Sequence, residues 1–163
     1  AKDCHQSWRV EAPCHGPVGN SMSTQRFLLA TAASALVMLT LGWLWHDSFM
    51  AAFYAEHTAL PRQVPLTRII ILGYVLLAFL MTYIYPKGYS GGDPLAEGVR
   101  FGMLMGVLFT LPHGIILYGA EGNHTGTLVI VDASWHIIEQ GMGGIVIALM
   151  HGRFNSSEPQ NEP

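Results

Sequence analysis

The stretch from Thr127 to Met150, TLVIVDASWHIIEQGMGGIVIALM, is long and apolar enough to cross a bilayer, which needs about 20 predominantly apolar residues. Four polar residues nevertheless lie inside it: Asp132, His136, Glu139 and Gln140. A charged side chain at mid-membrane costs roughly 2.5–3.5 kcal/mol on the insertion scale, so we exclude an arrangement in which these groups face lipid. The stretch therefore predicts a membrane helix packed against other helices around a polar interior.

The composition points to the same class of protein. Hydrophobic residues make up 50% of the 163-residue chain and charged residues only 12%, whereas a soluble domain usually carries about 25% charge. The length corresponds to one domain. The net charge is −3 and no basic cluster occurs, so nucleic acid is not an expected partner. We expect an integral membrane protein whose main partner is the lipid bilayer.

Four apolar segments fit membrane spans, at about 26–46, 66–86, 99–120 and 127–150. We predict an all-α fold, an antiparallel four-helix bundle covering 26–151. Trp43 and Trp45 end the first span, where aromatic residues form a belt at the membrane–water boundary. Residues 47–59 fit a helix extension or an interfacial segment, and Pro86 is expected to end the second span.

Both ends of the chain are polar. Residues 1–25 are predicted to be a disordered extension, with Met22 as the native start, and 152–163 a disordered tail. Cys4 and Cys14 each precede a histidine. We interpret them as incidental residues of an unstructured tail, and a metal site built from the two Cys–His pairs as the alternative.

The distribution of positive charge sets the expected orientation. An even number of spans places both termini on one side, and cytoplasmic flanks carry the excess of Lys and Arg. Four basic residues flank the spans on the terminal side and two on the opposite side: Arg26, Lys87, Arg100 and Arg153 against Arg62 and Arg68. This predicts a multi-pass protein of a bacterial inner membrane with both termini in the cytoplasm.

Each span has a polar or small-residue face when it is unrolled at 100° per residue. In the fourth span Asp132, His136, Glu139 and Gly143 lie within about 40° of one direction, and Gln140 lies slightly off it. Isoleucines occupy the opposite side and are expected to face lipid. The interior faces of the other spans comprise Thr31, Ser34, Met38, Gly42 and His46; Tyr74, Ala78, Thr82 and Tyr85; Gly102, Gly106, Phe109, Thr110 and His113.

The glycines on these faces favour close helix packing. Gly102 and Gly106 have the small-xxx-small spacing that lets two helices approach each other. Gly143 lies on the polar face of the fourth span. We predict that these three residues lie at helix–helix contacts.

Three functions are compatible with a polar core built from His113, Asp132, His136, Glu139 and Gln140. The leading hypothesis is a structural or interaction protein whose core groups form interhelical hydrogen bonds and need no cofactor. The alternatives are a metal- or haem-binding protein, with His113, His136 and Glu139 as the ligands, and a protein that translocates protons or a solute. Four spans are few for a monomeric transporter, so a homo-oligomer or a membrane-complex subunit is expected in that case.

The spans contain no nucleophile–base pair, phosphate-binding loop or paired cysteine motif, which argues against an enzyme, and we assign no catalytic residue. The Glu-x-x-His pairs of bundle-core di-metal sites are also missing.

Short stretches of the chain resemble a family of small bacterial membrane proteins that carries a domain-of-unknown-function label. They are LGWLWH at 41–46, YPKGY at 85–89, GMLMG at 102–106, LPHG at 111–114 and VDASWH at 131–136. The resemblance covers about residues 22–152 and implies a four-span topology. It implies no activity and carries over no catalytic residue.

Overall fold

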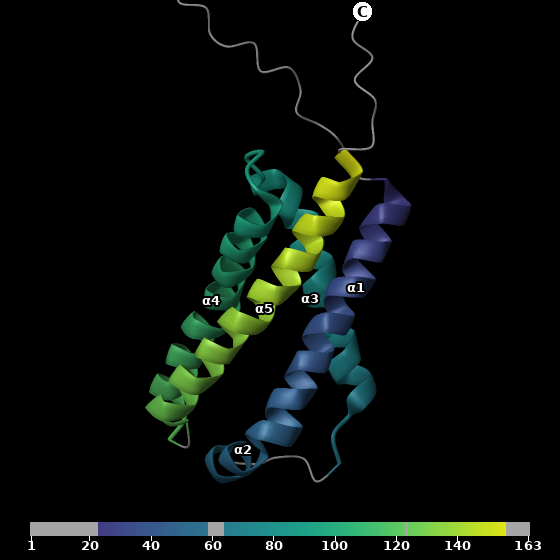
Figure 1. The fold of residues 1–163 in the computed structure, drawn as a ribbon. Coiled ribbons are helices and arrows are strands. Elements are labelled where there is room, and N and C mark those ends of the chain that lie inside the picture. Colours follow the sequence, from purple (N-terminus) through teal and green to yellow (C-terminus); the bar gives the residue numbers. More distant parts are fainter. Residues whose placement is uncertain (1–22, 59–63, 123, 156–163) are drawn as a thin grey trace, which may run out of the picture.

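The computed structural model describes residues 23–58, 64–122 and 124–155, and within these ranges the chain is all-helical, without strands. The described residues form five α-helices, labelled in Figure 1, and one π-helical turn. They are α1 (Thr24–Trp43), the π-helical turn η1 (Leu44–Phe49), α2 (Ala51–His57), α3 (Thr67–Gly88), α4 (Pro94–Ala120) and α5 (Gly126–Asn155). The predicted all-α class is confirmed. Met22, both Cys–His pairs, Arg62 and the segment 156–163 lie outside the described residues.

Three helical segments are long and apolar enough to cross a membrane: Thr24–Phe49, Thr67–Gly88 and Pro94–Ala120. They correspond to the first three predicted spans and indicate a membrane protein. In the described part of the chain α5 is not among them. Its length is sufficient, but Asp132, His136 and Glu139 lower its mean hydropathy.

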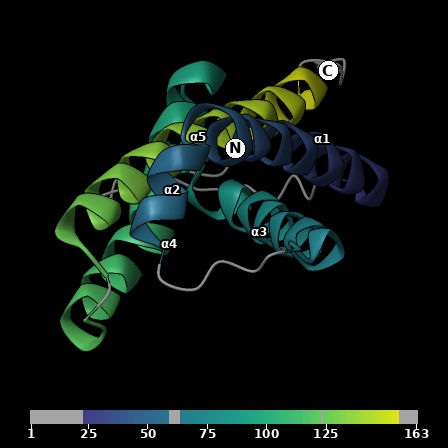
Figure 2. The same cartoon turned by 90° about the horizontal axis from the view of Figure 1, so that it is seen from below.

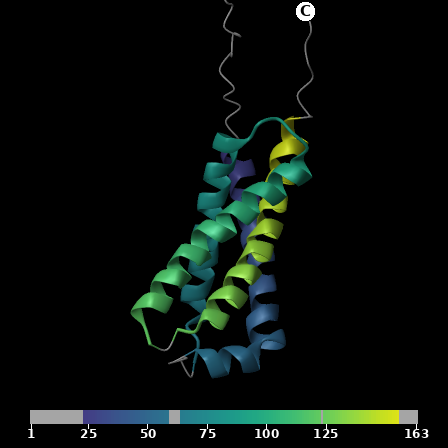
Figure 3. The same ribbon diagram turned by 90° about the vertical axis from the view of Figure 1, so that its left-hand side faces the viewer.

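The long helices alternate in direction along the chain, as the colours of Figure 1 show. The α5 helix is the central one, because it packs against α4 on one side and against α1 on the other. The α3 helix packs mainly on α1 and hardly contacts α4. The short α2 helix lies across the end of the molecule where α1 ends, which Figures 2 and 3 show from two directions.

Glycines allow α4 to lie directly on the backbone of α5. A Cβ atom added to Gly106 would lie 2.6 Å from the Cα of Ile137, and one added to Gly98 would lie 2.8 Å from the Cα of Ile145. The isoleucine side of α5 was expected to face lipid, and this expectation is wrong at these two positions. Ile130 and Ile138, which are 67% and 59% exposed, do face outward. The physical reason is that α4 packs against the apolar side of α5, while α1 packs against its polar side.

The contact between α1 and α5 forms the interior that the sequence predicts. Ser34 Oγ donates a hydrogen bond to the Gly143 carbonyl over 3.1 Å, and Met38 is fully buried against Gly143. The predicted inner faces of the first two spans are confirmed by burial of these residues: Thr31, Ser34, Met38 and Gly42 on α1, and Ala78, Thr82 and Tyr85 on α3.

One helix boundary differs from the prediction. The α3 helix continues through Pro86 to Gly88 instead of ending at the proline. Proline lacks its own N–H and its ring crowds the carbonyl four residues earlier, but Lys87 and Gly88 keep their N–H groups, so the helix can continue for two residues beyond it.

Candidate functional site

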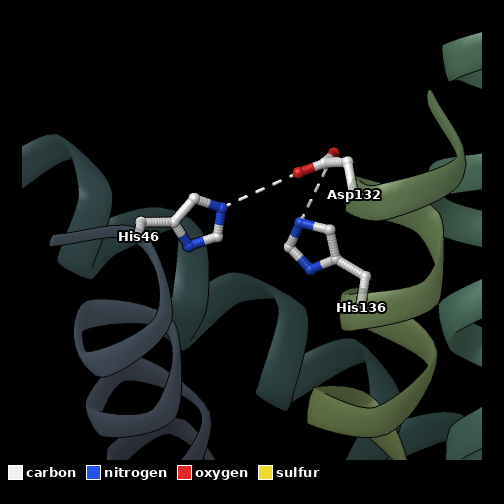
Figure 4. Close-up of side chains that lie close together, drawn as sticks. All are labelled: His46, Asp132 and His136. Carbon is white, nitrogen blue, oxygen red and sulfur yellow. Dashed lines mark ion pairs between the residues drawn. The ribbon is translucent and has the colours of Figure 1, made fainter. Parts of the chain in front are cut away.

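The polar residues of α5 gather with side chains of three other elements near the end of the bundle where α2 lies. Asp132 and His136 are one turn apart on α5, and His46 reaches them from η1 (Figure 4). We call His46, Asp132 and His136 the triad. The antiparallel contact of α1 with α5 brings them together, because the row Ser34, Gly42 and His46 meets Gly143, Glu139 and His136 in turn.

The ligand atoms of the triad are spaced for a shared partner rather than for direct hydrogen bonds. His46 Nε2 lies 3.7 Å from Asp132 Oδ1, and His136 Nε2 lies 3.8 Å from Asp132 Oδ2. One nitrogen or oxygen atom from each of the three residues lies within 4.8 Å of the others. Two ligands bound to one ion at about 2.1 Å each are at most about 4.2 Å apart. Both imidazole–carboxylate separations, one to each Asp132 oxygen, lie below this limit.

Each imidazole of the triad is held through its Nδ1 atom. His136 Nδ1 lies 2.8 Å from Glu139 Oε2, and His46 Nδ1 lies 3.0 Å from the Gly42 carbonyl oxygen. A carbonyl and a carboxylate accept hydrogen bonds, so both Nδ1 atoms must be the protonated donors. In the neutral imidazoles the lone pairs are consequently on the Nε2 atoms, which face Asp132.

Two tyrosines fix the carboxylates. Tyr74 Oη donates to Glu139 Oε1 over 2.9 Å, and Tyr54 Oη donates to Asp132 Oδ1 over 3.0 Å. Burial raises the pKa of Tyr54 above its usual value, and the negative charge of Asp132 adds to the increase, so this hydroxyl remains a donor. Glu139 is fully buried, whereas the triad side chains are 15–32% exposed.

The π-helical turn places His46. The Met50 N–H bonds to the Trp45 carbonyl over 2.8 Å, a spacing of five residues that widens the helix at this point. Trp45 stacks on Trp135 of α5, with ring centroids 4.3 Å apart and planes 1° apart. Trp45 is therefore partly covered by α5, whereas Trp43 is 60% exposed. The stacked pair holds η1 against α5 beside the triad.

The structure separates the predicted site residues into three groups. Asp132, His136 and Glu139 come together, as their shared helical face implies. His113 is exposed on α4 and forms no hydrogen bond or ion pair with them in the described ranges. Gln140 is fully buried, and its amide has no hydrogen-bond partner among the described residues.

The position of His113 follows from the course of the α4–α5 contact. This contact follows every fourth residue of α4, through Gly98, Gly102, Gly106 and Gly114. Every fourth residue of an α-helix advances by about 40° around the axis. By Gly114, which approaches Val129, the contact has rotated away from the face that carries His113.

Sequence reasoning omitted three residues from the site: His46, Tyr54 and Tyr74. His46 and Tyr74 do lie on the predicted inner faces of their spans, so helical periodicity was a usable signal for both. Tyr54 lies in the segment predicted to be interfacial, and its sequence context contains no such signal.

Two cavities meet at His136 and Tyr74. One, of about 590 Å³, lies between α1–η1 and the start of α3, and its lining combines apolar residues with polar ones that include His46, Asp47 and Thr67. The other, of about 700 Å³, lies between α3 and α4 and is almost entirely apolar. The two histidines of the triad therefore border a partly polar cavity on one side.

No protein-family model matches the chain, and neither the curated proteins nor the solved structures contain a significant match to it.

Proposed function

We propose that the protein is a four-span membrane protein that binds a divalent transition-metal ion at His46, Asp132 and His136. The observation that carries this proposal is the orientation of the two imidazoles. Both have their Nδ1–H groups bound to oxygen acceptors, so their Nε2 lone pairs face each other and the Asp132 carboxylate. Three electron-rich groups facing one another require protons or a cation between them.

The residues around the triad support a metal rather than protons alone. Metal-binding histidines usually donate their second ring N–H to a carboxylate or a backbone carbonyl, which fixes the tautomer. Glu139 and the Gly42 carbonyl provide these two acceptors here. The π-helical turn that carries His46 is a second supporting feature, because π-turns occur frequently at functional sites.

Two imidazoles and one carboxylate suit Zn²⁺, Fe²⁺ or Mn²⁺. Three protein ligands leave at least one coordination position for water or a substrate, as in catalytic rather than structural zinc sites. The partial exposure of the triad and the partly polar cavity beside His46 and His136 fit such an open position.

The test uses purified protein with Cys4→Ser and Cys14→Ser, so that the N-terminal thiols do not bind metal. The protein is loaded with Zn²⁺ or Co²⁺, desalted, and its metal content measured. We expect one ion per chain, with visible Co²⁺ absorption of a nitrogen- and oxygen-ligated site, and loss of both in His46→Gln, Asp132→Asn and His136→Gln. His113→Ala is the matched control. Equal metal content in all variants would overturn the proposal.

The structural role expected from the sequence remains a second candidate. The bonds Tyr54–Asp132 and Tyr74–Glu139 link α2 and α3 to α5 through two carboxylates of α5. A purely structural cluster predicts that replacing any triad residue lowers the thermal unfolding midpoint. A metal site predicts that the metal-free variants remain close to the metal-free parent in stability.

The membrane topology is part of the proposal. The α5 helix is inferred to be the fourth span, because its polar side chains contact other helices instead of lipid. With the cytoplasmic termini that the basic residues predict, the triad lies toward the outer end of the bundle in a bacterial inner membrane. Labelling of single cysteines placed at Gly91 and Gly122 in intact cells tests this orientation, because only Gly122→Cys should react with an impermeant reagent.

A further inference from the structure

The apolar cavity between α3 and α4 has a polar floor. Its walls are formed by aliphatic and aromatic side chains such as Leu77, Leu80, Leu108 and Phe109. Tyr74 and His136 form the floor together with Glu139, which is fully buried. Because α3 and α4 hardly touch each other, the cavity opens between them on the surface that we assign to the hydrocarbon layer. Its volume of about 700 Å³ is in the range of small-molecule sites.

The charges around the cavity select a neutral ligand. No lysine or arginine lines it, so a phosphate or carboxylate head group would have no cationic partner. The nearest ionisable partners are Glu139 and His136, which already bond to each other. An anionic head group beside Glu139 would be repelled at the low dielectric of a membrane interior.

The hydrogen bonds at the floor of the cavity favour a ligand that donates a hydrogen bond. The Tyr74 O–H is used by Glu139, and the His136 Nδ1–H is used by the same carboxylate. The Tyr74 oxygen can still accept a hydrogen bond, because a phenolic hydroxyl can accept while it donates. A ligand hydroxyl could donate to this oxygen, whereas a ketone, ester or ether oxygen would find no free donor there.

We propose that this cavity binds a neutral, lipid-soluble alcohol or phenol whose hydroxyl donates to Tyr74 and whose apolar chain lies between α3 and α4. From Tyr74 to Ile84, the last lining residue of α3, the helix rises about 15 Å. This is roughly the extended length of a twelve-carbon chain. The proposal shares His136 with the triad but does not depend on a bound metal.

The experiment uses the full chain in phosphatidylcholine nanodiscs and a twelve-carbon alcohol with a photoreactive diazirine in its chain. Adducts mapped by mass spectrometry are expected on residues of α3 and α4 that line the cavity. Unlabelled dodecanol should compete about two- to tenfold better than its methyl ether, which lacks the donor, since one hydrogen bond contributes about 0.5–1.5 kcal/mol. Dodecanoic acid should compete at least as poorly as the ether. Chelator-treated and zinc-loaded samples should give the same pattern.

Two variants and one control complete the test. Leu108→Trp should fill the cavity and abolish labelling. Leu104, one turn away on α4, is as exposed as Leu108 but does not line the cavity, so Leu104→Trp should leave the labelling unchanged. Tyr74→Phe should remove the preference for the alcohol over the ether. Unfolding midpoints of all variants identify any that fail to fold. Equal competition by alcohol, ether and acid, or equal labelling of the two tryptophan variants, would show that the cavity accepts any lipid chain and would overturn the proposal.

Discussion

The imidazole of His136 and the carboxylate of Glu139, three residues apart on α5, are joined by a contact of 2.8 Å between Nδ1 and Oε2. The Glu139 carboxylate also accepts a hydrogen bond from Tyr74. This second bond holds the carboxylate in the position from which it orients the His136 ring. The result is that His136 Nε2 faces Asp132 and His46. A fully buried Glu139 thus determines which nitrogen of a partly exposed histidine is available.

The Glu139→Gln substitution tests this positioning role. Loss of the carboxylate should weaken metal binding about 10- to 100-fold, because outer-shell partners of a metal-bound histidine have effects of this size. The stoichiometry should remain one ion per chain at saturation. Competition with a chelator of known affinity measures the change. Glu121→Gln, in the loop after α4, is the control, and an affinity equal to the parent's in Glu139→Gln would contradict the assigned role.

The stacked rings of Trp45 and Trp135 should contribute a coupling energy of about 0.5–1.5 kcal/mol. A double-mutant cycle with Trp45→Leu and Trp135→Leu, followed by reversible unfolding in mixed micelles, measures it. Trp135→Leu should also weaken metal binding, because His46 follows Trp45 directly in η1. Trp43→Leu serves as the exposed control. Additive effects of the two leucine substitutions would show that the stack does not stabilise η1.

Gly42 lies where no larger side chain fits. A Cβ atom at this position would overlap the Tyr74 hydroxyl and lie 2.7 Å from Glu139 Oε1. We expect Gly42→Ala to destabilise the protein by about 1–3 kcal/mol, as overpacking does, and to break the Tyr74–Glu139 bond. Gly73→Ala, where no atom lies within 4 Å of the added Cβ, should be neutral or slightly stabilising. The thermal unfolding midpoints of the two variants measure the difference, and equal midpoints would contradict the prediction.

We expect the α4–α5 contact to be equally intolerant of side chains larger than glycine. A Cβ atom on Gly102 would overlap the carbonyl oxygen of Gln140 and lie 2.7 Å from the Cα of Gly141. Backbone atoms cannot rotate away, so Gly102→Ala should separate the two helices and cost about 1–3 kcal/mol. Gly119→Ala, on the same helix in open space, is the control. A Gly102→Ala protein as stable as Gly119→Ala would mean that α4 and α5 do not approach as closely as described.

The helical class, three membrane-compatible segments and the inward residues of α1, α3 and α5 could be predicted from the sequence, whereas Phe109 and His113, predicted to face the interior, are exposed on α4. The correct predictions were possible because membrane spans need about 20 apolar residues and because side chains on one helix face recur with a fixed period. The inward row Ser34, Met38, Gly42 and the polar row Asp132, His136, Glu139 both follow from that period.

Which helix faces meet, and at which height along the helices, depends on packing between segments far apart in the chain. Periodicity gives a direction around one helix, but the offset between two helices depends on the fit of their surfaces. That fit brought His46 to Asp132 and Tyr74 to Glu139. It also left His113 outside, because the glycine contact rotates around α4 as it follows every fourth residue. Asp132 and His136 could therefore be predicted as neighbours from the sequence. The third member of the triad, His46, could not, because its position depends on packing between segments more than 80 residues apart.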